Sequence, residues 1–528
     1  MLLWRWDDIH SPLPASPMTV SVWDRTVTQG MAEAARASGR TGRSLRRRIN
    51  GYSYSALVPS PPTPDHESAV PQTTEDAVVS TRQRWDSEFL PALERDLEYM
   101  RAVDLESASD AKLLKRLEEF FEIQKRHWYF HFLVVFPVSE AAERMAALYR
   151  DAMGAVPDGE PYELLQGMGN MTLETDRALR SLAEKAREAP EVESIIMEGS
   201  RPEEILPGLR NSDAGRRFIQ SMDRFLSVYG YRPTGFDYVY PSWIEDPSFV
   251  LLNIKSYLSS DPRDLDREQE GQAKHAKSLL DRALRSLGSE HAKRDEFLDA
   301  YDRARELWPL KEDHAFYIDQ GSTALLRILI AEMGGRLSRR EILRSPDDVF
   351  YLDIDELTAA MSHPVPTDMQ RLVDARRRER DRFMKVSPPP VLGTLPPEDG
   401  LLVQPELQRM VGPVMALPPD GASTALRGVS GSRGTATGPA RVVRGPDDFD
   451  KVRPGDVLVC TSTTPTWTPL FASVAALASD SGGVLSHTAI VAREYGLPAV
   501  VGVKYGTSVI RDGQVVTVDG DAGVVLLR

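Results

Sequence analysis

The chain has 528 residues, of which 41% are hydrophobic, 27% charged and 8% aromatic, a composition typical of folded globular proteins. This length predicts about three domains of roughly 100 to 200 residues each. The formal net charge of −14 argues against a generally basic surface for binding nucleic acid or an anionic membrane.

A single cysteine, Cys460, excludes an internal disulfide framework and a cysteine metal cluster, and it suits a reducing compartment. The first residues carry acidic side chains and prolines where a signal peptide needs an apolar core. No run of about 18 apolar residues occurs. We therefore expect a cytoplasmic protein with neither a nucleic-acid nor a membrane partner.

Residues 1–75 mix aromatic residues, prolines and turn residues without a sustained period, and they end in the proline-rich stretch Pro59–Pro71. This predicts an irregular N-terminal arm. The arginine-rich run Arg36–Arg48 within it is interpreted as a solvated loop.

Residues 76–386 change to long amphipathic segments with few β-branched alternations, which predict one large, mainly helical domain. The clearest of these segments are Arg84–Val103, Asp110–Val135, Ser139–Met153, Glu174–Ala189 and Glu268–Leu287. Residues 387–420 are rich in proline and glycine and predict a semi-rigid linker.

Residues 421–528 are rich in valine, glycine, threonine and aspartate. Short apolar runs such as ARVVRG, DVLVC, AVVGV and VVTVDG are separated by turn signals, which predicts strands around one or two helices. A compact α/β domain on such a tether is suited to movement between sites.

The segment Ser479–Val503, SDSGGVLSHTAIVAREYGLPAVVGV, carries the most chemical information. Ser486 is a good N-cap, a short helix is expected from about His487 to Tyr495, and Gly496 follows as its C-terminal stop. In the first turn the helix dipole opposes a positive charge, so His487 favours neutral imidazole, which can attack phosphorus or accept a proton. The free backbone N–H groups there would hold an attached phosphoryl group.

The stretch GGVLSHTAIVAREYGLPAVVG resembles the signature of the mobile domain of phosphoenolpyruvate-utilising enzymes, and GTATGPARVV, PGDVLVCTSTTPTWTPLF and DGQVVTVDGDAGVV extend the resemblance over residues 421–528. The resemblance implies a swivelling β/β/α fold in which His487 carries the phosphoryl group. The expected fold is thus multidomain, α and α/β, with the helical domain first. The residues expected to support the histidine loop are Gly482, Gly483, Ser486, Thr488, Arg493, Thr463 and Thr464.

A weaker resemblance, to rifampicin phosphotransferase-like proteins, covers WDDIHSPLPASP, YGYRPTGFDYVYPSWIEDP and ELWPLKEDHAFYIDQ. It implies that the helical domain binds the acceptor molecule. Tyr231 stands where a histidine is expected, which puts an acid/base role there in doubt. The substrate-binding candidates are His127, Trp128, His131, Arg232, Trp243, Glu312, His314 and His10.

His127 and His131 lie one helical turn apart, a spacing that could ligate a metal. No glutamate follows in the zincin arrangement, and Trp128, Tyr129 and Phe132 favour an aromatic pocket or core packing instead. Metal binding is therefore not predicted.

The resemblance also implies an ATP-grasp domain that charges the histidine, and we expect it to be absent from this chain, because no recognisable phosphate loop occurs. We therefore expect no cofactor within this chain. If phosphotransfer occurs, ATP and Mg²⁺ are expected to be bound by a separate partner.

Three hypotheses remain. The chain is half of a split phosphotransferase with a separate ATP-grasp subunit, or a dehydratase, isomerase or cyclase that uses His487 as acid or base, or a non-catalytic binding protein. The intact histidine loop argues against the last. In either enzyme the substrate is expected to be an apolar small molecule, such as a secondary metabolite.

Overall fold

The computed structural model describes residues 2–39, 43–58, 75–199, 201–259, 264–362, 368–393 and 424–528. They form two compact units, each built from separated stretches of the chain. Unit 1 contains residues 1–138, 235–241 and 314–402, and unit 2 contains residues 139–234, 242–313 and 403–528. Because this division crosses the predicted helical domain, the predicted bounds of 76–386 stay a prediction. Among the described residues, no helix is both long and apolar enough to cross a membrane.

Unit 1 combines a small antiparallel sheet with helices. The sheet has the order β2-β3-β1-β4, with β1 (Trp4–Trp6), β2 (Arg43–Ile49), β3 (Tyr52–Val58) and β4 (Val391–Leu392). The N-terminal helices are α1 (Pro17–Arg25), α2 (Val27–Ala37) and α4 (Leu90–Arg101), with the π-helix η1 (Trp85–Phe89) before α4. The later elements are η2 (Phe316–Ser322), α15 (Thr323–Arg339), η3 (Pro346–Tyr351), α16 (Ile354–Ser362) and α17 (Met369–Phe383).

The prediction of an irregular arm over residues 1–75 is wrong for the described part, which contains three strands and two helices. Strands β2 and β3 form a hairpin whose two-residue turn is Asn50-Gly51, and both of these residues have positive φ, at 50° and 82°. Asn-Gly is the pair that such turns favour, so the signal was present. Arg46, interpreted as part of a solvated loop, lies instead in β2, with its guanidinium 4.8 Å from the Trp23 ring centre. Pro59–Pro71 lies outside the described residues.

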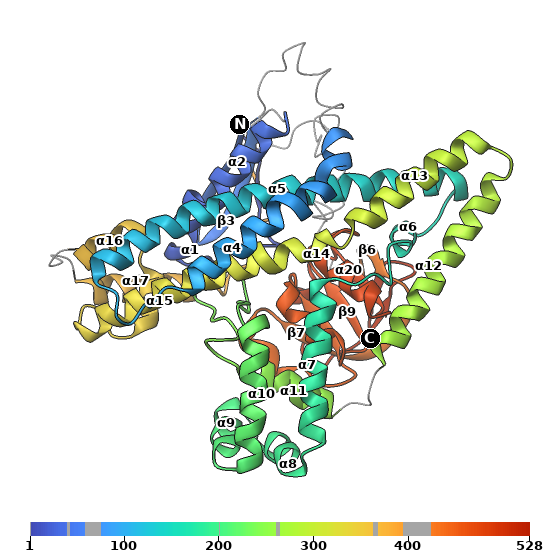
Figure 1. Cartoon of the computed structure of the whole chain (residues 1–528). Coiled ribbons are helices and arrows are strands. Elements are labelled where there is room, and N and C mark those ends of the chain that lie inside the picture. Colours follow the sequence, from blue (N-terminus) through green and yellow to red (C-terminus); the bar gives the residue numbers. More distant parts are fainter. Residues whose placement is uncertain are drawn as a thin grey trace. The chain divides into compact units, whose positions relative to one another are not determined.

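Helix α5 (Asp110–Met153) joins two predicted segments into one helix of 44 residues with Pro137 inside it, and it contributes residues to both units (Figure 1). The short helix α14 (Leu310–Ala315) likewise has residues in both.

The other helices of unit 2 precede its sheet in sequence. They are α6 (Glu160–Glu163), α7 (Met171–Arg187), α8 (Pro190–Glu198), α9 (Pro202–Arg210), α10 (Asp213–Tyr229), α11 (Ser248–Leu258), α12 (Leu265–Leu287) and α13 (His291–Leu307). Their amphipathic faces produce this fold locally: α7 buries Leu179, Leu182 and Ala183 and starts at Asn170, whose side chain accepts from the backbone of Leu173.

The C-terminal part of unit 2 is an eight-stranded mixed sheet of order β5-β12-β11-β7-β8-β9-β10-β6. Its strands are β5 (Ala425–Arg427), β6 (Val429–Ser432), β7 (Thr435–Val443), β8 (Val457–Cys460), β9 (Ala476–Ser479), β10 (Ala499–Val501), β11 (Val515–Asp519) and β12 (Val524–Leu527). The four strands β7, β8, β9 and β10 run parallel to one another, and the other neighbouring pairs in the sheet are antiparallel. The helices α19 (Thr468–Phe471), α20 (His487–Glu494) and α21 (Gly506–Val509) lie between strands in sequence.

This arrangement confirms the predicted fold class, a mainly helical region followed by an α/β domain. The predicted strand runs form β7, β8, β10 and β11. One apolar core of unit 2 includes side chains of α7, α10 and α11 together with Phe449, Trp467 and Val491 of the C-terminal domain. The linker prediction over 387–420 falls mostly on residues 394–423, which lie outside the described residues.

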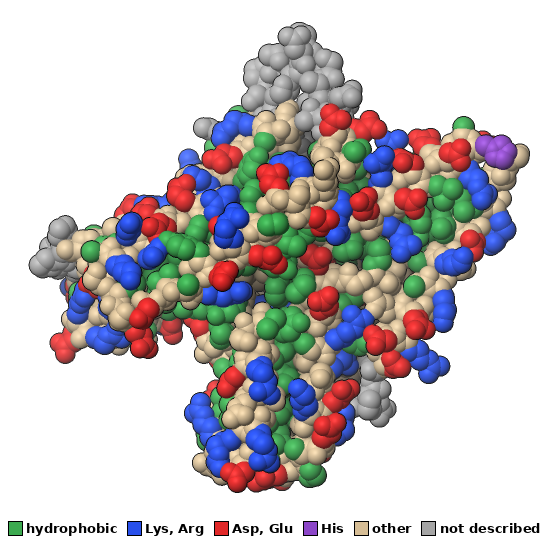
Figure 2. All heavy atoms as spheres, in the orientation of Figure 1, with side chains coloured by type: hydrophobic (Ala, Val, Ile, Leu, Met, Phe, Trp, Pro, Cys, Tyr) green, Lys and Arg blue, Asp and Glu red, His purple; other side chains and the backbone are tan. Residues whose placement is uncertain are grey.

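Acidic and basic side chains are interspersed over the face of the molecule shown in Figure 2. This mixture agrees with the negative net charge of the sequence.

Gly520 provides a test of the C-terminal domain's packing. A Cβ atom at this position would overlap the backbone carbonyl oxygen of Ser432, which cannot move away easily. We expect Gly520→Ala to destabilise the chain by about 1–3 kcal/mol, measured by calorimetric unfolding. The control is Gly271→Ala in α12, where a Cβ meets nothing within 4 Å, and which should stabilise by up to about 1 kcal/mol. Equal stability of the two variants would contradict the described sheet packing.

Candidate active site

The loop before α20 fixes where His487 lies. Ser486 is the N-cap of α20, with a side chain that accepts from the backbone of Ala489, and Gly496 follows the helix at φ 59°. Gly482 has φ 100°, and a Cβ there would approach the Ser486 hydroxyl to 2.7 Å, so this position requires glycine. The Ser486 hydroxyl donates to the Gly483 carbonyl at 2.8 Å. These observations confirm the predicted helix, its cap and its stop.

His487 contacts a carboxylate from a distant part of the sequence. Its Nδ1 lies 3.2 and 3.1 Å from the two carboxylate oxygens of Glu312 in α14, and both residues belong to unit 2. The Nε2 atom lies 3.5 Å from the Thr468 hydroxyl, a long contact, and the side chain of His487 is 14% exposed. Because an ionised carboxylate only accepts, Nδ1 carries the proton and the lone pair lies on Nε2.

Glu312 is itself held in place. It is 4% exposed, and its Oε2 accepts a hydrogen bond of 2.9 Å from the hydroxyl of Thr172 at the start of α7. The next residue, Asp313, accepts from the backbone N–H of Met171 at 2.8 Å. These two contacts fix α14 to the N-terminus of α7 and orient the carboxylate toward His487.

Arg232 and Trp243 lie buried behind this pair. Arg232 is 2% exposed, and its guanidinium carbon lies 5.1 Å from the Trp243 ring centre. Burial lowers the pKa of Arg232 to about 9, while the negative charge of Glu312 opposes that shift, so the guanidinium stays cationic at neutral pH. Its charge offsets the buried Glu312 carboxylate. Trp243 is fully buried, so it packs in the core instead of lining an open pocket.

The other residues predicted to support the histidine loop contact one another. The hydroxyls of Thr463 and Thr488 lie 2.8 Å apart, and Thr464 pairs with Thr466 at 2.6 Å. Arg493 is 2% exposed and donates to the carbonyls of Gly431 and Val484 at 2.7 and 2.8 Å, which ties α20 to β6 and to the loop.

The remaining candidates lie in unit 1. His127 and His131 do not converge: His127 Nε2 lies 3.1 Å from Asp96, and His131 Nδ1 lies 2.8 Å from Asp319. The ring of His131 packs at 4.7 Å against that of His314 and at 4.8 Å against that of Trp128. His10 pairs with Asp7 at 2.9 Å and packs against Phe236.

Sequence reasoning missed polar partners of these histidines and of Glu312. Thr468 and Thr172 contact the His487–Glu312 pair, and Asp319 contacts His131. Thr468 and Asp319 both lie in stretches that carry the family resemblance, but no local pattern marks their side chains as polar partners of a histidine.

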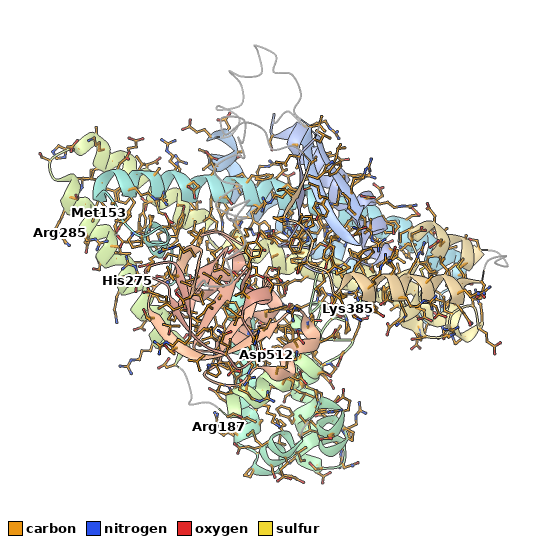
Figure 3. All side chains as sticks on the ribbon, turned by 180° about the vertical axis from the view of Figure 1, so that it is seen from behind. Met153, Arg187, His275, Arg285, Lys385 and Asp512 are labelled. Atoms are coloured by element: carbon orange, nitrogen blue, oxygen red, sulfur yellow. The ribbon has the colours of Figure 1, made fainter. Side chains whose placement is uncertain are left out.

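A cluster of ionic contacts holds the C-terminal domain against the helices of unit 2. Arg433, between β6 and β7, pairs with Glu160 and Glu163 of α6, in the latter case at 2.9 Å. The same carboxylates accept from Arg282 and His275 of α12. His275 projects from α12 in Figure 3, and its Nε2 lies 2.7 Å from Glu163. Burial raises the pKa of Glu163, while its hydrogen bond with His275 opposes the rise.

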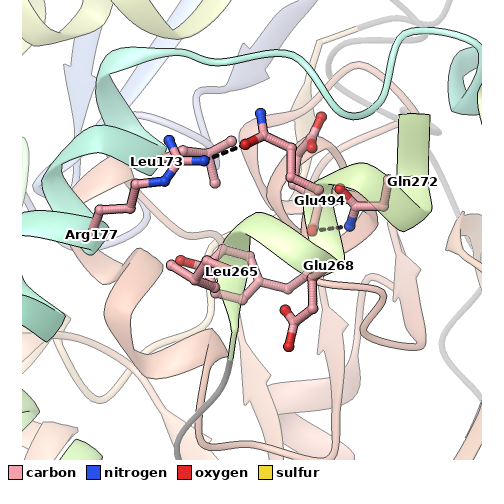
Figure 4. A pocket seen from close by; sticks show the side chains of 8 residues that line it. Leu173, Arg177, Leu265, Glu268, Gln272 and Glu494 are labelled. Carbon is pink, nitrogen blue, oxygen red and sulfur yellow. Dashed lines mark hydrogen bonds between the residues drawn. The ribbon is translucent and has the colours of Figure 1, made fainter. Parts of the chain in front are cut away.

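The C-terminal end of α20 is also bound to α12. The side-chain amide of Gln272 donates to the backbone carbonyls of Arg493 and Glu494, as Figure 4 shows for Glu494. Gln166 donates to the Arg493 carbonyl at 2.5 Å. Together with the cluster at α6, these contacts hold α20 in the position that brings His487 to Glu312.

Comparisons with known proteins agree with this architecture. Residues 452–523 match the family described as the mobile domain of PEP-utilising enzymes, and residues 131–312 match the rifampicin phosphotransferase fourth domain. Both matches lie on the parts that carry His487 and Glu312.

Three relatives align with different shares of this chain and of their own length. Chondramide synthase cmdD of Chondromyces crocatus is 36% identical over 100% of this chain and 14% of its own length. The uncharacterized phosphotransferase YvkC of Bacillus subtilis is 33% identical over 82% of this chain and 50% of its own. A rifampicin phosphotransferase of Streptomyces sviceus is 32% identical over 68% of this chain and 40% of its own. The chain thus spans half or less of the length of these relatives.

The chain therefore contains a match to the mobile domain of phosphoenolpyruvate-utilising enzymes in its C-terminal part and a match to the rifampicin phosphotransferase fourth domain in its helical part, as the sequence predicted.

Glu494 makes the docking of α20 sensitive to pH. Burial raises the pKa of this carboxyl to about 8, and the nearby Glu312 adds to the rise. The folded, docked chain therefore keeps the proton between about pH 4.5 and 8, while the undocked or unfolded chain loses it, so stability falls as pH rises through this window.

We expect the melting temperature of the wild type to fall when the pH is raised from 5.5 to 8.5. This decrease should exceed the decrease measured for Glu494→Gln, whose side chain cannot ionise, by about 4 °C or more. The control is Glu268→Gln, a substitution at another carboxylate that lines the same pocket in Figure 4, and it should keep the wild-type pH dependence. The same pH dependence in Glu494→Gln and the wild type would show that Glu494 is not buried in the docked state.

Proposed function

We propose that the chain carries a phosphoryl group on Nε2 of His487 and transfers it to a hydroxyl of a small, largely apolar acceptor. The observation that carries this proposal is the contact between Nδ1 of His487 and the buried Glu312 carboxylate. It keeps the proton on Nδ1 and leaves the nucleophilic lone pair on Nε2, in a side chain that is 14% exposed.

The transfer step follows from the same geometry. The acceptor oxygen attacks phosphorus, the P–O bond forms, the P–Nε2 bond breaks, and its electron pair returns to Nε2. Nε2 then takes up the proton of the acceptor hydroxyl, which makes the ring an imidazolium. Glu312 stabilises this cation. While Nε2 carries no phosphoryl group, the positive charge of Arg232 offsets the negative charge of the Glu312 carboxylate.

The phosphoryl donor in this proposal is ATP with Mg²⁺, bound by an ATP-grasp domain on a separate subunit. The relatives named as phosphotransferases support a phosphotransfer reaction, and more than half of the rifampicin phosphotransferase's length lies outside the match. The mobile domain would receive the group from that partner and deliver it to the acceptor in the docked state described above.

The acceptor class rests on the named relatives. One is a chondramide synthase, one a prodigiosin synthesizing transferase of Serratia marcescens, and several are rifampicin phosphotransferases. These names support a secondary metabolite as the acceptor.

A second candidate function is favoured by the same dyad. A histidine whose Nδ1 is held by a carboxylate also serves as a general base, so the chain could catalyse a dehydration, isomerisation or cyclisation without phosphate. The two functions differ in one requirement: phosphotransfer needs nucleotide and a partner, whereas acid/base catalysis proceeds in the lone chain.

The test is phosphorylation of His487. The chain is incubated with ATP labelled at the β and γ positions, alone and with an ATP-grasp protein encoded beside it, and the His487 peptide is analysed by mass spectrometry without acid. We expect label on this peptide only with the partner. Turnover of a small molecule by the lone chain without nucleotide would instead establish the acid/base enzyme.

Substitutions separate the roles of the two dyad residues. His487→Ala should lower turnover about a thousandfold or more and abolish labelling, while Glu312→Gln should lower turnover about a hundredfold or more by removing the charge that stabilises the imidazolium. The control is His291→Ala, at an exposed position in α13. Melting temperatures within a few degrees of the wild type would exclude unfolding as the cause. Full turnover in His487→Ala would contradict both candidate functions.

A further inference from the structure

Three side chains of metal-ligand type converge inside unit 1, apart from the pair that the proposed function uses. They are His131 from α5, His314 from α14 and Asp319 from η2, and one ligand atom of each lies within 4.8 Å of the others. His131 and His314 are 9% and 3% exposed, and the Asp319 side chain is 13% exposed.

Backbone geometry explains how His314 and Asp319 meet. They are five residues apart, a spacing that places side chains on different faces of a regular α-helix. Here α14 continues directly into the π-helix η2, whose i→i+5 hydrogen bonds widen the turn. The π-helix is therefore the local feature that allows both residues to face His131.

The chemistry of the cluster suits a cation. Nδ1 of His131 and Oδ1 of Asp319 lie 2.8 Å apart, so in the absence of a metal a proton joins two atoms that could both ligate one. The buried imidazole of His314, ring to ring with His131 at 4.7 Å, adds a third ligand that a simple His–Asp pair does not require.

The surroundings favour binding as well. The rings of Trp128 and Phe132 pack against His131 at 4.8 and 4.7 Å, which gives the cluster an apolar wall that strengthens its electrostatic interactions.

We propose that His131, His314 and Asp319 bind one divalent transition-metal ion. Two imidazoles and one carboxylate are the ligand set that Zn²⁺ accepts when a water or a substrate fills its fourth position. This site goes beyond the proposed phosphotransfer and does not depend on it, because none of its ligands contributes to the His487–Glu312 pair.

The test uses the full chain, stripped of metal with a chelator and then loaded with Zn²⁺ alone. After gel filtration, elemental analysis should find one Zn²⁺ per chain in the wild type. Asp319→Asn should weaken Zn²⁺ affinity by more than the roughly 10- to 100-fold that loss of an outer-shell partner costs. His314→Ala should do the same. The control is Asp96→Asn, which removes the carboxylate partner of His127 and should leave Zn²⁺ binding unchanged.

X-ray absorption of the Zn²⁺-loaded wild type needs no variant, so it stands even if a substitution prevents folding. It should show two imidazole ligands with nitrogen and oxygen at about 2.0–2.2 Å. A wild-type chain that retains no Zn²⁺, or folded Asp319→Asn and His314→Ala variants that retain as much as the wild type, would overturn the proposal.

Discussion

The interaction on which the site depends is the hydrogen bond from Nδ1 of His487 to Glu312. An imidazole alone has two nearly equivalent tautomers, and only one of them presents a lone pair on Nε2. A buried carboxylate removes that ambiguity, because it accepts a hydrogen bond and donates none. In the proposed transfer it also stabilises the positive charge that develops on the ring when Nε2 takes up a proton.

That hydrogen bond requires the mobile domain to be docked on the helices of unit 2. Polar contacts contribute to this docking: Arg433 on the carboxylates of α6, the Gln272 amide on the end of α20, and the Tyr495 hydroxyl on Asp176 at 2.6 Å. Charged contacts of this kind are costly to bury and strongly directional, so they specify one docked geometry. The docked state also buries apolar side chains of both parts in one core, among them Trp467 and Val491 together with side chains of α7 and α11.

The elements that short stretches of sequence determine were predictable. Ser486, His487 and Gly496 encode the start and end of α20 within ten residues, and the valine-rich runs encode the parallel strands. The partner of His487 was not predictable as such, because Glu312 lies 175 residues away and only the fold brings the two together. The same holds for Asp319, whose approach to His314 depends on a π-helix that periodicity does not reveal. The Asn50-Gly51 hairpin is different, since its turn signal was present and was overlooked.

The central claim is that Glu312 fixes the tautomer of His487. It is tested most directly by ¹⁵N NMR of the histidine-labelled chain near neutral pH, with the His487 signals assigned by their loss in His487→Ala. For the neutral form of the ring, the account predicts the proton on Nδ1 and an unprotonated Nε2, and a shift toward a mixture of tautomers in Glu312→Gln. A wild-type ring protonated mainly on Nε2, or ¹⁵N signals that do not change in Glu312→Gln, would contradict it.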